Sequence, residues 1–119
     1  MKIAFDLDDT ITLAPEFFST LSKLWNDDVY VITLRADRQE TIIDLENLDI
    51  RCTDVILVSS CEEKAEVVKR LGIRVYFDDM PETLKDMPEE TAVCLFRNAW
   101  NFDFEDRRWI FTDKTGKLT

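Results

Sequence analysis

Carboxylate side chains cluster directly after the first apolar run of the chain, where a β-strand is expected to end. The apolar residues 3–5 lead into residues 6–10, which read DLDDT. Alternate residues of an extended chain point to the same side, roughly 6.6 Å apart, so Asp6 and Asp8 can face one pocket in which one attacks and the other moves protons. Carboxylates about 5 Å apart repel by roughly 3 kcal/mol at an effective dielectric near 20, so such a cluster needs a hard divalent cation or must take up protons. These residues therefore indicate metal-assisted phosphate chemistry.

The composition narrows the class of protein that carries this site. A chain of 119 residues with 45% hydrophobic residues, two glycines and three prolines is expected to form one domain, residues 1–119, without long linkers. Its net charge of -10 opposes general binding to nucleic acid and to anionic membranes. Because the chain contains no histidine, Ser-His and Cys-His nucleophiles and histidine-containing zinc sites are excluded. Any chemistry must use carboxylates, hydroxyls and amines.

The cysteines and the hydropathy pattern bear on localisation. The three cysteines are odd in number and lack metal-ligand spacing, so Cys52, Cys61 and Cys94 are predicted to be small buried thiols in a reducing compartment. The first residues run straight into acids, and no later segment approaches about 18 consecutive apolar residues, so neither a signal segment nor a membrane span is expected. We expect a cytoplasmic protein.

Short β-rich runs alternate with helical patterns along the chain, which is typical of a parallel sheet with crossover helices. Strands are predicted over residues 3–5, 29–33, 55–58, 74–77 and 92–96. Helices are predicted over residues 15–25, after a cap at Asp37, over residues 60–71 with Gly72 as the stop, and from Pro81. Aromatic residues of the first of these helices, Phe17, Phe18 and Trp25, are predicted to be core. The expected fold class is α/β, a three-layer Rossmann-like sheet of about five parallel strands with helices on both faces.

Polar residues fall where the predicted strands end. In open parallel sheets, ligands bind beyond the carboxyl ends of the strands, where the strand order reverses. Asp6 and Asp8 follow the first strand, Thr33 ends the second, and Asp78 and Asp79 follow the fourth. Lys64 lies on the helix before that fourth strand. We therefore expect four separate segments to converge on one site.

These elements, taken in order, resemble the haloacid dehalogenase (HAD) superfamily of phosphohydrolases over most of the chain. The matching positions are residues 6–10, Thr33, Lys64 and the pair Asp78-Asp79. The resemblance implies a phosphoric monoester hydrolase in which Asp6 is the nucleophile that forms an aspartyl-phosphate and Asp8 is the acid and then the base.

The same resemblance implies a set of ligand contacts. Thr10, Thr33 and Lys64 would hold substrate, with Thr33 and Lys64 on the phosphoryl oxygens. Magnesium would be held by the Asp6 carboxylate, the Asp8 carbonyl and the pair Asp78-Asp79, and which of that pair binds directly stays open.

The chain also departs from the family pattern. Leu34 follows Thr33 where many members carry a small residue or Asn, so substrate contact could pass to Arg35 or Arg38. Thr83 stands where a further Asp is common, which implies weaker metal binding. The intervals between the motifs leave no room for a cap domain. The expected site is open, and it suits an accessible phosphate end of a larger molecule, or a small ester if a second copy of the chain covers it.

Several of these residues could have an ordinary structural or surface role instead of a role in the site. Thr10 could satisfy turn backbone, Lys64 could be a solvated helix lysine with Lys69 in its place at the site, and Arg35, Arg38 and Arg97 could be surface arginines or could steer an anionic ester. The C-terminal stretch, residues 96–119, interleaves aromatic and basic residues. A hairpin closing a sheet edge or a dimer contact explains this stretch, and stacking on a nucleobase, as in a nucleotidase, is the alternative.

Two other functional classes share a fold of this kind. A receiver-type signalling module needs its acceptor Asp after the third strand, where this chain has Ser59-Ser60. A catalytically silent binding module of the same fold would not need both Asp6 and Asp8. The sequence therefore favours the phosphatase hypothesis.

Overall fold

The computed structural model describes residues 1–98, which form a five-stranded sheet with all strands parallel, in the order β3-β2-β1-β4-β5. The strands are β1 (Lys2–Phe5), β2 (Val29–Thr33), β3 (Asp54–Leu57), β4 (Ile73–Asp78) and β5 (Ala92–Leu95). The helices are α1 (Pro15–Leu24), α2 (Arg38–Asn47), α3 (Cys61–Leu71) and α4 (Pro81–Leu84), and an irregular helical turn, η1 (Leu7–Ile11), follows β1. The predicted α/β, Rossmann-like fold is confirmed.

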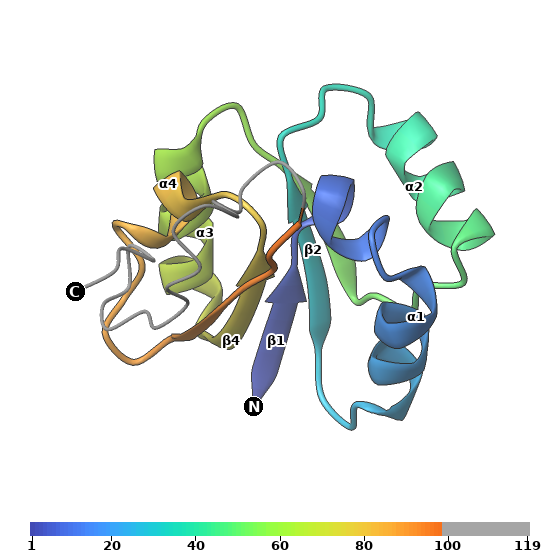
Figure 1. Cartoon of the computed structure of the whole chain (residues 1–119), viewed down its shortest axis with the longest axis horizontal. Coiled ribbons are helices and arrows are strands. Elements are labelled where there is room, and N and C mark those ends of the chain that lie inside the picture. The colour runs from blue at the N-terminus through green and yellow to red at the C-terminus, as the bar shows by residue number, and fades with distance from the viewer. Residues whose placement is uncertain (99–119) are drawn as a thin grey trace.

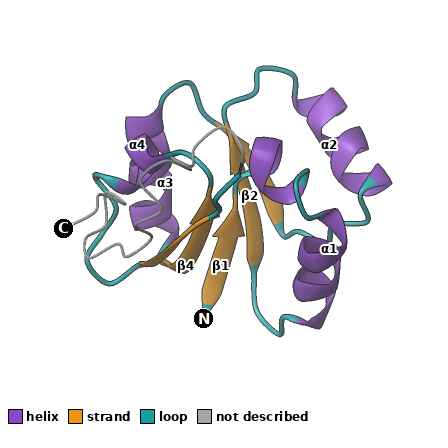
Figure 2. Cartoon of the chain, viewed as in Figure 1, coloured by secondary structure: helices purple, strands orange, loops and turns teal. Residues whose placement is uncertain are grey.

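Helices cover both faces of the sheet, with α1 and α2 on one side and α3 and α4 on the other (Figures 1 and 2). Successive strand residues point to opposite faces, so β1 serves two cores. Ile3 and Phe5 belong to the core under α1 and α2, whereas Ala4 belongs to the core under α3 and α4. Packing on both faces of the sheet fixes the position of β1 along its two neighbouring strands.

The helix boundaries follow from capping interactions that can be predicted from the sequence. The Asp37 carboxylate accepts a hydrogen bond from the Glu40 N–H at the start of α2, and the Ser60 hydroxyl accepts one from the Glu63 N–H at the start of α3. Gly72 ends α3 with a φ of 69°, in the left-handed region that glycine adopts without strain. The caps set the direction in which α3 presents its first turn to the sheet.

Some predictions about burial were wrong. Phe18 is fully buried, but Phe17 is 50% exposed and lies against the rings of Phe18 and Phe96. Adjacent residues of a helix are about 100° apart around its axis, so only one of the two phenylalanines can face the sheet. Trp25 is half-buried against the same core, with its indole N–H donating to the Met1 carbonyl.

The cysteines also differ from the prediction. All three thiols are unpaired, but they are half-buried rather than buried. Two of them lie at or next to the ends of elements, Cys52 before β3 and Cys61 at the start of α3, where side chains reach the surface. Cys94 is on β5, which within residues 1–98 has a neighbouring strand on one side only.

The connections leave no inserted domain over the carboxyl ends of the strands within the described residues. Only η1 and α1 lie between β1 and β2, and only α2 and β3 lie between β2 and α3. No helix in residues 1–98 has both the length and the apolar character needed to cross a membrane. The aromatic-rich segment predicted as a hairpin or dimer contact lies mostly outside the described residues, because these end at residue 98.

Candidate active site

The polar strand ends meet at the carboxyl edge of the sheet because β1 lies between β2 and β4. Phe5 is level with Val31 on one side and with Phe77 on the other. The Asp6 N–H donates to the Phe77 carbonyl at 2.9 Å, which sets Asp6 beside the residue that follows Phe77. The predicted convergence of separate segments is therefore present.

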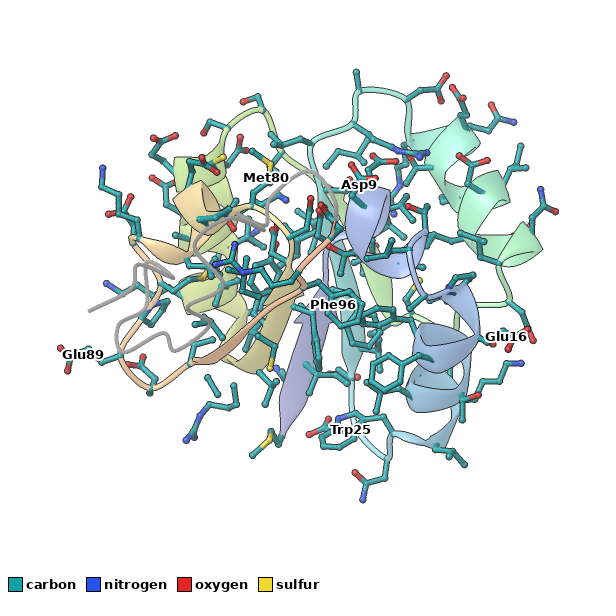
Figure 3. The ribbon with its side chains drawn as sticks, viewed as in Figure 1. Asp9, Glu16, Trp25, Met80, Glu89 and Phe96 are labelled. Atoms are coloured by element: carbon teal, nitrogen blue, oxygen red, sulfur yellow. The ribbon has the colours of Figure 1, made fainter. Side chains whose placement is uncertain are left out.

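A pocket of about 230 Å³ lies at this edge. Most of the sequence-predicted site residues line it, and the lining residues are Asp6, Asp8, Asp9, Thr33, Leu34, Lys64, Asp79 and Met80. Figure 3 shows Asp9 and Met80 near the top of the sheet, where the chain leaves β1 and β4. The other predicted residues, Thr10, Arg35 and Asp78, do not line the pocket but bind to residues that do.

Lys64 extends from the first turns of α3 into the carboxylate cluster. Its ammonium Nζ lies 3.0 Å from Asp6 Oδ1 and 2.9 Å from Asp78 Oδ2, and the side chain is 1% exposed. Burial alone would lower the pKa of Lys64, but the charges of Asp6 and Asp78 outweigh it and raise that pKa. Lys64 is thus a buried cation and not a solvated surface lysine, whereas Lys69 is exposed in the last turn of α3.

Asp78 is fully buried and its carboxylate is occupied by three donors. Tyr76 donates its hydroxyl to Asp78 Oδ2 at 2.5 Å, Lys64 binds the same oxygen, and the Met80 N–H donates to Oδ1 at 2.9 Å. Sequence reasoning missed Tyr76, although it stands two residues before Asp78 on one strand, and such residues point to the same face. In this structure, Asp78 therefore binds Lys64.

Asp79 faces the pocket and completes a group of three carboxylates. Its Oδ1 accepts a hydrogen bond from the Thr10 hydroxyl at 3.3 Å. Asp6, Asp78 and Asp79 each offer an oxygen, and these oxygens lie within 4.8 Å of one another. The Lys64 ammonium binds two of these three carboxylates, so the cluster keeps an excess of negative charge, and hard oxygen donors of this kind suit Mg²⁺. Because Asp79 lines the pocket and Asp78 does not, Asp6 and Asp79 are the pair best placed for such an ion.

The surplus negative charge also changes the acidity of the cluster. Burial, followed by the charge of Asp78, raises the pKa of Asp6 to about 7 against the opposing effect of Lys64. Burial and Asp78 also raise the pKa of Asp79. Without a cation, Asp6 therefore holds a proton well above the pH at which carboxyl groups ordinarily lose it.

This shift predicts that the metal-free protein loses stability as the pH rises. The ordinary pKa of Asp6 is 3.8 and the folded value is about 7, so between them the folded state keeps a proton that the unfolded state has released. The unfolding free energy should then fall by about 1.4 kcal/mol per pH unit, on the order of 3 kcal/mol between about pH 5 and pH 7. Magnesium should restore the loss at about pH 8, since it replaces the proton.

Urea unfolding at a series of pH values, with magnesium or with EDTA, measures this effect. The matched control is Asp6→Asn, which cannot ionise and should flatten the metal-free profile. A metal-free wild-type profile that stays level or rises from about pH 5 to pH 8 would contradict the charge balance described for the cluster.

Asp8 is held from the opposite side by an arginine. Arg35 donates through Nη2 to Asp8 Oδ1 at 2.7 Å and through Nε to Asp8 Oδ2 at 3.0 Å, while its Nη1 donates to Asp44 of α2 at 2.6 Å. These hydrogen bonds from Arg35 lower the pKa of Asp8 and raise that of Arg35. Arg35, predicted to contact substrate, is engaged by two carboxylates in this structure.

The other two arginines that the sequence offered for the rim differ in position. Arg38 binds Asp54 at 2.9 Å and the Val55 carbonyl, both at the amino end of β3 and away from the pocket. The prediction that Arg38 lies at the rim was therefore wrong, because its long side chain reaches to the amino end of β3, where Asp54 and the Val55 carbonyl accept its hydrogen bonds. Arg97 is half-buried, and burial lowers its pKa.

Thr33 presents a buried hydroxyl at the pocket. The residue is 1% exposed, and its Oγ1 has no hydrogen-bond partner among residues 1–98. Buried hydroxyls in folded proteins almost always have a partner, so this one is available to a ligand in the pocket. Among the side chains of residues 1–98 that line the pocket, those of Thr33 and Lys64 can donate to an anion.

Comparison of the chain with protein-family models, with curated proteins and with solved structures finds no match. The conclusions about function therefore depend on the geometry of the site.

Proposed function

We propose that the protein is a magnesium-dependent phosphomonoester hydrolase that works through an aspartyl-phosphate on Asp6. The observation that carries this proposal is the composition of the pocket. It places a carboxylate, Asp6, next to two donors for phosphoryl oxygens, the Lys64 ammonium and the unpartnered Thr33 hydroxyl. Phosphoryl transfer depends mainly on positioning and on neutralising charge, and these are the groups that it requires.

The reaction divides into two displacements. An Asp6 carboxylate oxygen attacks phosphorus, the bond from phosphorus to the ester oxygen breaks, and Asp8 gives its proton to the departing oxygen. Water then attacks the phosphorus of the acyl phosphate while Asp8 takes its proton, which releases inorganic phosphate and regenerates Asp6. Asp8 is 54% exposed, so water and the leaving group can reach it.

Several residues contribute without reacting themselves. Lys64 and Thr33 bind the phosphoryl oxygens, and Asp78 and Tyr76 keep Lys64 in position. Mg²⁺, held by Asp6 and Asp79 with the Asp8 carbonyl as the predicted third ligand, would neutralise negative charge on the transferred group. The lowered pKa of Asp8 favours its role as base, so Arg35 must release Asp8 before the acid step.

Phosphate release from p-nitrophenyl phosphate, sugar phosphates and nucleotides, measured with magnesium or with EDTA, tests the proposal. We expect turnover that requires magnesium. The better substrates should be small phosphate esters or larger molecules with an accessible phosphate end, because the described residues place no domain over the pocket. If the protein binds magnesium but releases no phosphate from any ester, the fold serves for binding and the proposal is wrong.

No feature of the described residues favours the alternative that the protein is a receiver-type signalling module. Ser59 and Ser60 follow β3, which is an edge strand, whereas the acidic residues follow β1 and β4 in the middle of the sheet.

A further inference from the structure

A second hollow adjoins the catalytic pocket. Its volume is about 480 Å³, and it lies between the loop after β2 and the loop after β3. This second hollow is called the groove below. Leu34 lines both the groove and the pocket, and Arg35, which lines the groove, binds Asp8 in the pocket. An ester whose phosphoryl group lies against Asp6 therefore has this groove directly beside it.

The lining of the groove is mostly apolar. The aliphatic residues that line it are Leu34, Ala36, Leu57 and Val58. Leu34 is 38% exposed, so much of its side chain is open to contact with a ligand. A surface of this kind favours a leaving group with an apolar body, because burying that body removes apolar area from water.

The rim of the groove carries a net negative charge. The positive charge of Arg35 is matched by Asp8 and also by Asp44, which leaves one carboxylate in excess. Glu63, which also lines the groove, adds another. Its Oε2 accepts hydrogen bonds from the Ser59 N–H and hydroxyl, both at 2.8 Å. Within residues 1–98, Glu63 forms no ion pair, and its recorded hydrogen bonds use Oε2 and not Oε1.

We infer that this groove binds the leaving group of the phosphomonoester and selects leaving groups that are neutral or cationic, with an apolar body and an amine or hydroxyl for Glu63. The inference rests on the proposed phosphatase function and adds a substrate class to it. It disfavours esters that carry a second anionic group, including the phosphate ends of nucleic acids, since the rim would repel them.

Three aryl phosphates with the same reacting bond test the charge preference. O-phosphotyramine has a cationic tail, 4-ethylphenyl phosphate a neutral one, and 3-(4-phosphonooxyphenyl)propionate an anionic one. We expect kcat/KM to fall in that order for the wild-type protein with magnesium. Glu63→Gln should reduce the preference for the amine over the carboxylate by up to about fivefold, the upper range for a solvent-exposed ion pair.

The controls separate the groove from general electrostatics and from folding. Glutamine serves as well as glutamate three residues after a helix cap, so Glu63→Gln keeps the start of α3. Glu66→Gln removes the same charge from an exposed position of the same helix and should leave the preference unchanged. Ala36→Trp, at an exposed position on the groove, should raise KM for all three aryl esters and spare acetyl phosphate, whose leaving group is small.

The possible outcomes are distinct. Turnover without a charge preference, a preference for the anionic ester, or equal effects of Glu63→Gln and Glu66→Gln would overturn the inference and leave the phosphatase proposal standing. A wild-type protein that hydrolyses none of the esters, acetyl phosphate included, would overturn both.

Discussion

Asp6→Asn is expected to remove phosphatase activity while leaving the fold intact. The amide has the shape of the carboxyl group but cannot form an acyl phosphate, so kcat/KM should fall by at least about a thousandfold, as for other catalytic nucleophiles. The unfolding free energy should not fall, because the substitution takes one buried negative charge out of a cluster of three carboxylates in which one ammonium binds only Asp6 and Asp78. Initial rates of phosphate release and urea unfolding, measured at the same pH, report the two effects separately.

A matched substitution in the same pocket gives the control. Asp9 also lines the pocket, has a φ of 60°, and has no part in the proposed reaction. Asparagine tolerates that left-handed backbone well, so Asp9→Asn should keep most of the activity. An Asp6→Asn protein that retains turnover close to that of the wild type would show that phosphate is released by another route.

Lys64→Met is expected to destabilise the protein strongly. The methionine fills a similar volume, but it leaves the buried carboxylates of Asp6 and Asp78 without the ammonium that binds both. Removing one partner of a buried ion pair costs about 3–5 kcal/mol. The loss should be smaller at about pH 5 than at about pH 8, because Asp6, with a pKa of about 7, takes up a proton at the lower pH.

Urea unfolding of Lys64→Met and of Lys69→Met at both pH values measures this effect. Lys69 lies on the same helix but is exposed, so its substitution should change the unfolding free energy by less than about 0.5 kcal/mol. Failure of Lys64→Met to fold at the higher pH agrees with the account. Equal stability of the two variants would mean that Lys64 does not balance the charge of the cluster.

The parallel strands, the helix starts and the convergence of the polar strand ends could be predicted from the sequence because they depend on local patterns, whereas the strand order came from the structure. Strand residues alternate between faces, caps such as Asp37 and Ser60 mark helix starts, and the polar residues stand at strand ends. Once the strands are parallel and β1 is central, Asp6 and Asp78 must lie close together. These features need no knowledge of individual side-chain conformations.

The partners of the individual side chains could not be predicted in this way. Arg35 and Arg38 stand three residues apart, yet one reaches Asp8 at the carboxyl edge and the other reaches Asp54 at the amino end of β3. The outcome depends on how the loop between β2 and α2 turns, which no local pattern specifies. Tyr76 was missed for a different reason, since an aromatic residue in a strand is first interpreted as core.

The assignment of the acidic pair after β4 also needed the structure. In the sequence, Asp78 and Asp79 are equivalent candidates for a metal ligand. In the fold, Asp78 is the last residue of β4 and is enclosed by Tyr76, Lys64 and the Met80 N–H, whereas Asp79 faces the pocket. Which of the two carboxylates faces the pocket depends on where β4 ends and on the side chains packed around that end, which no local pattern specifies.

The most direct test of the central claim is to trap the acyl phosphate on Asp6. The variant Asp8→Asn with p-nitrophenyl phosphate and magnesium suits this purpose, because p-nitrophenolate leaves without a proton while hydrolysis of the intermediate lacks its base. After quenching, borohydride reduces an aspartyl-phosphate to homoserine, which peptide mass spectrometry locates. We predict homoserine at position 6, dependent on both substrate and magnesium. Release of p-nitrophenolate without modification of Asp6, or with modification at another carboxylate, would contradict the account.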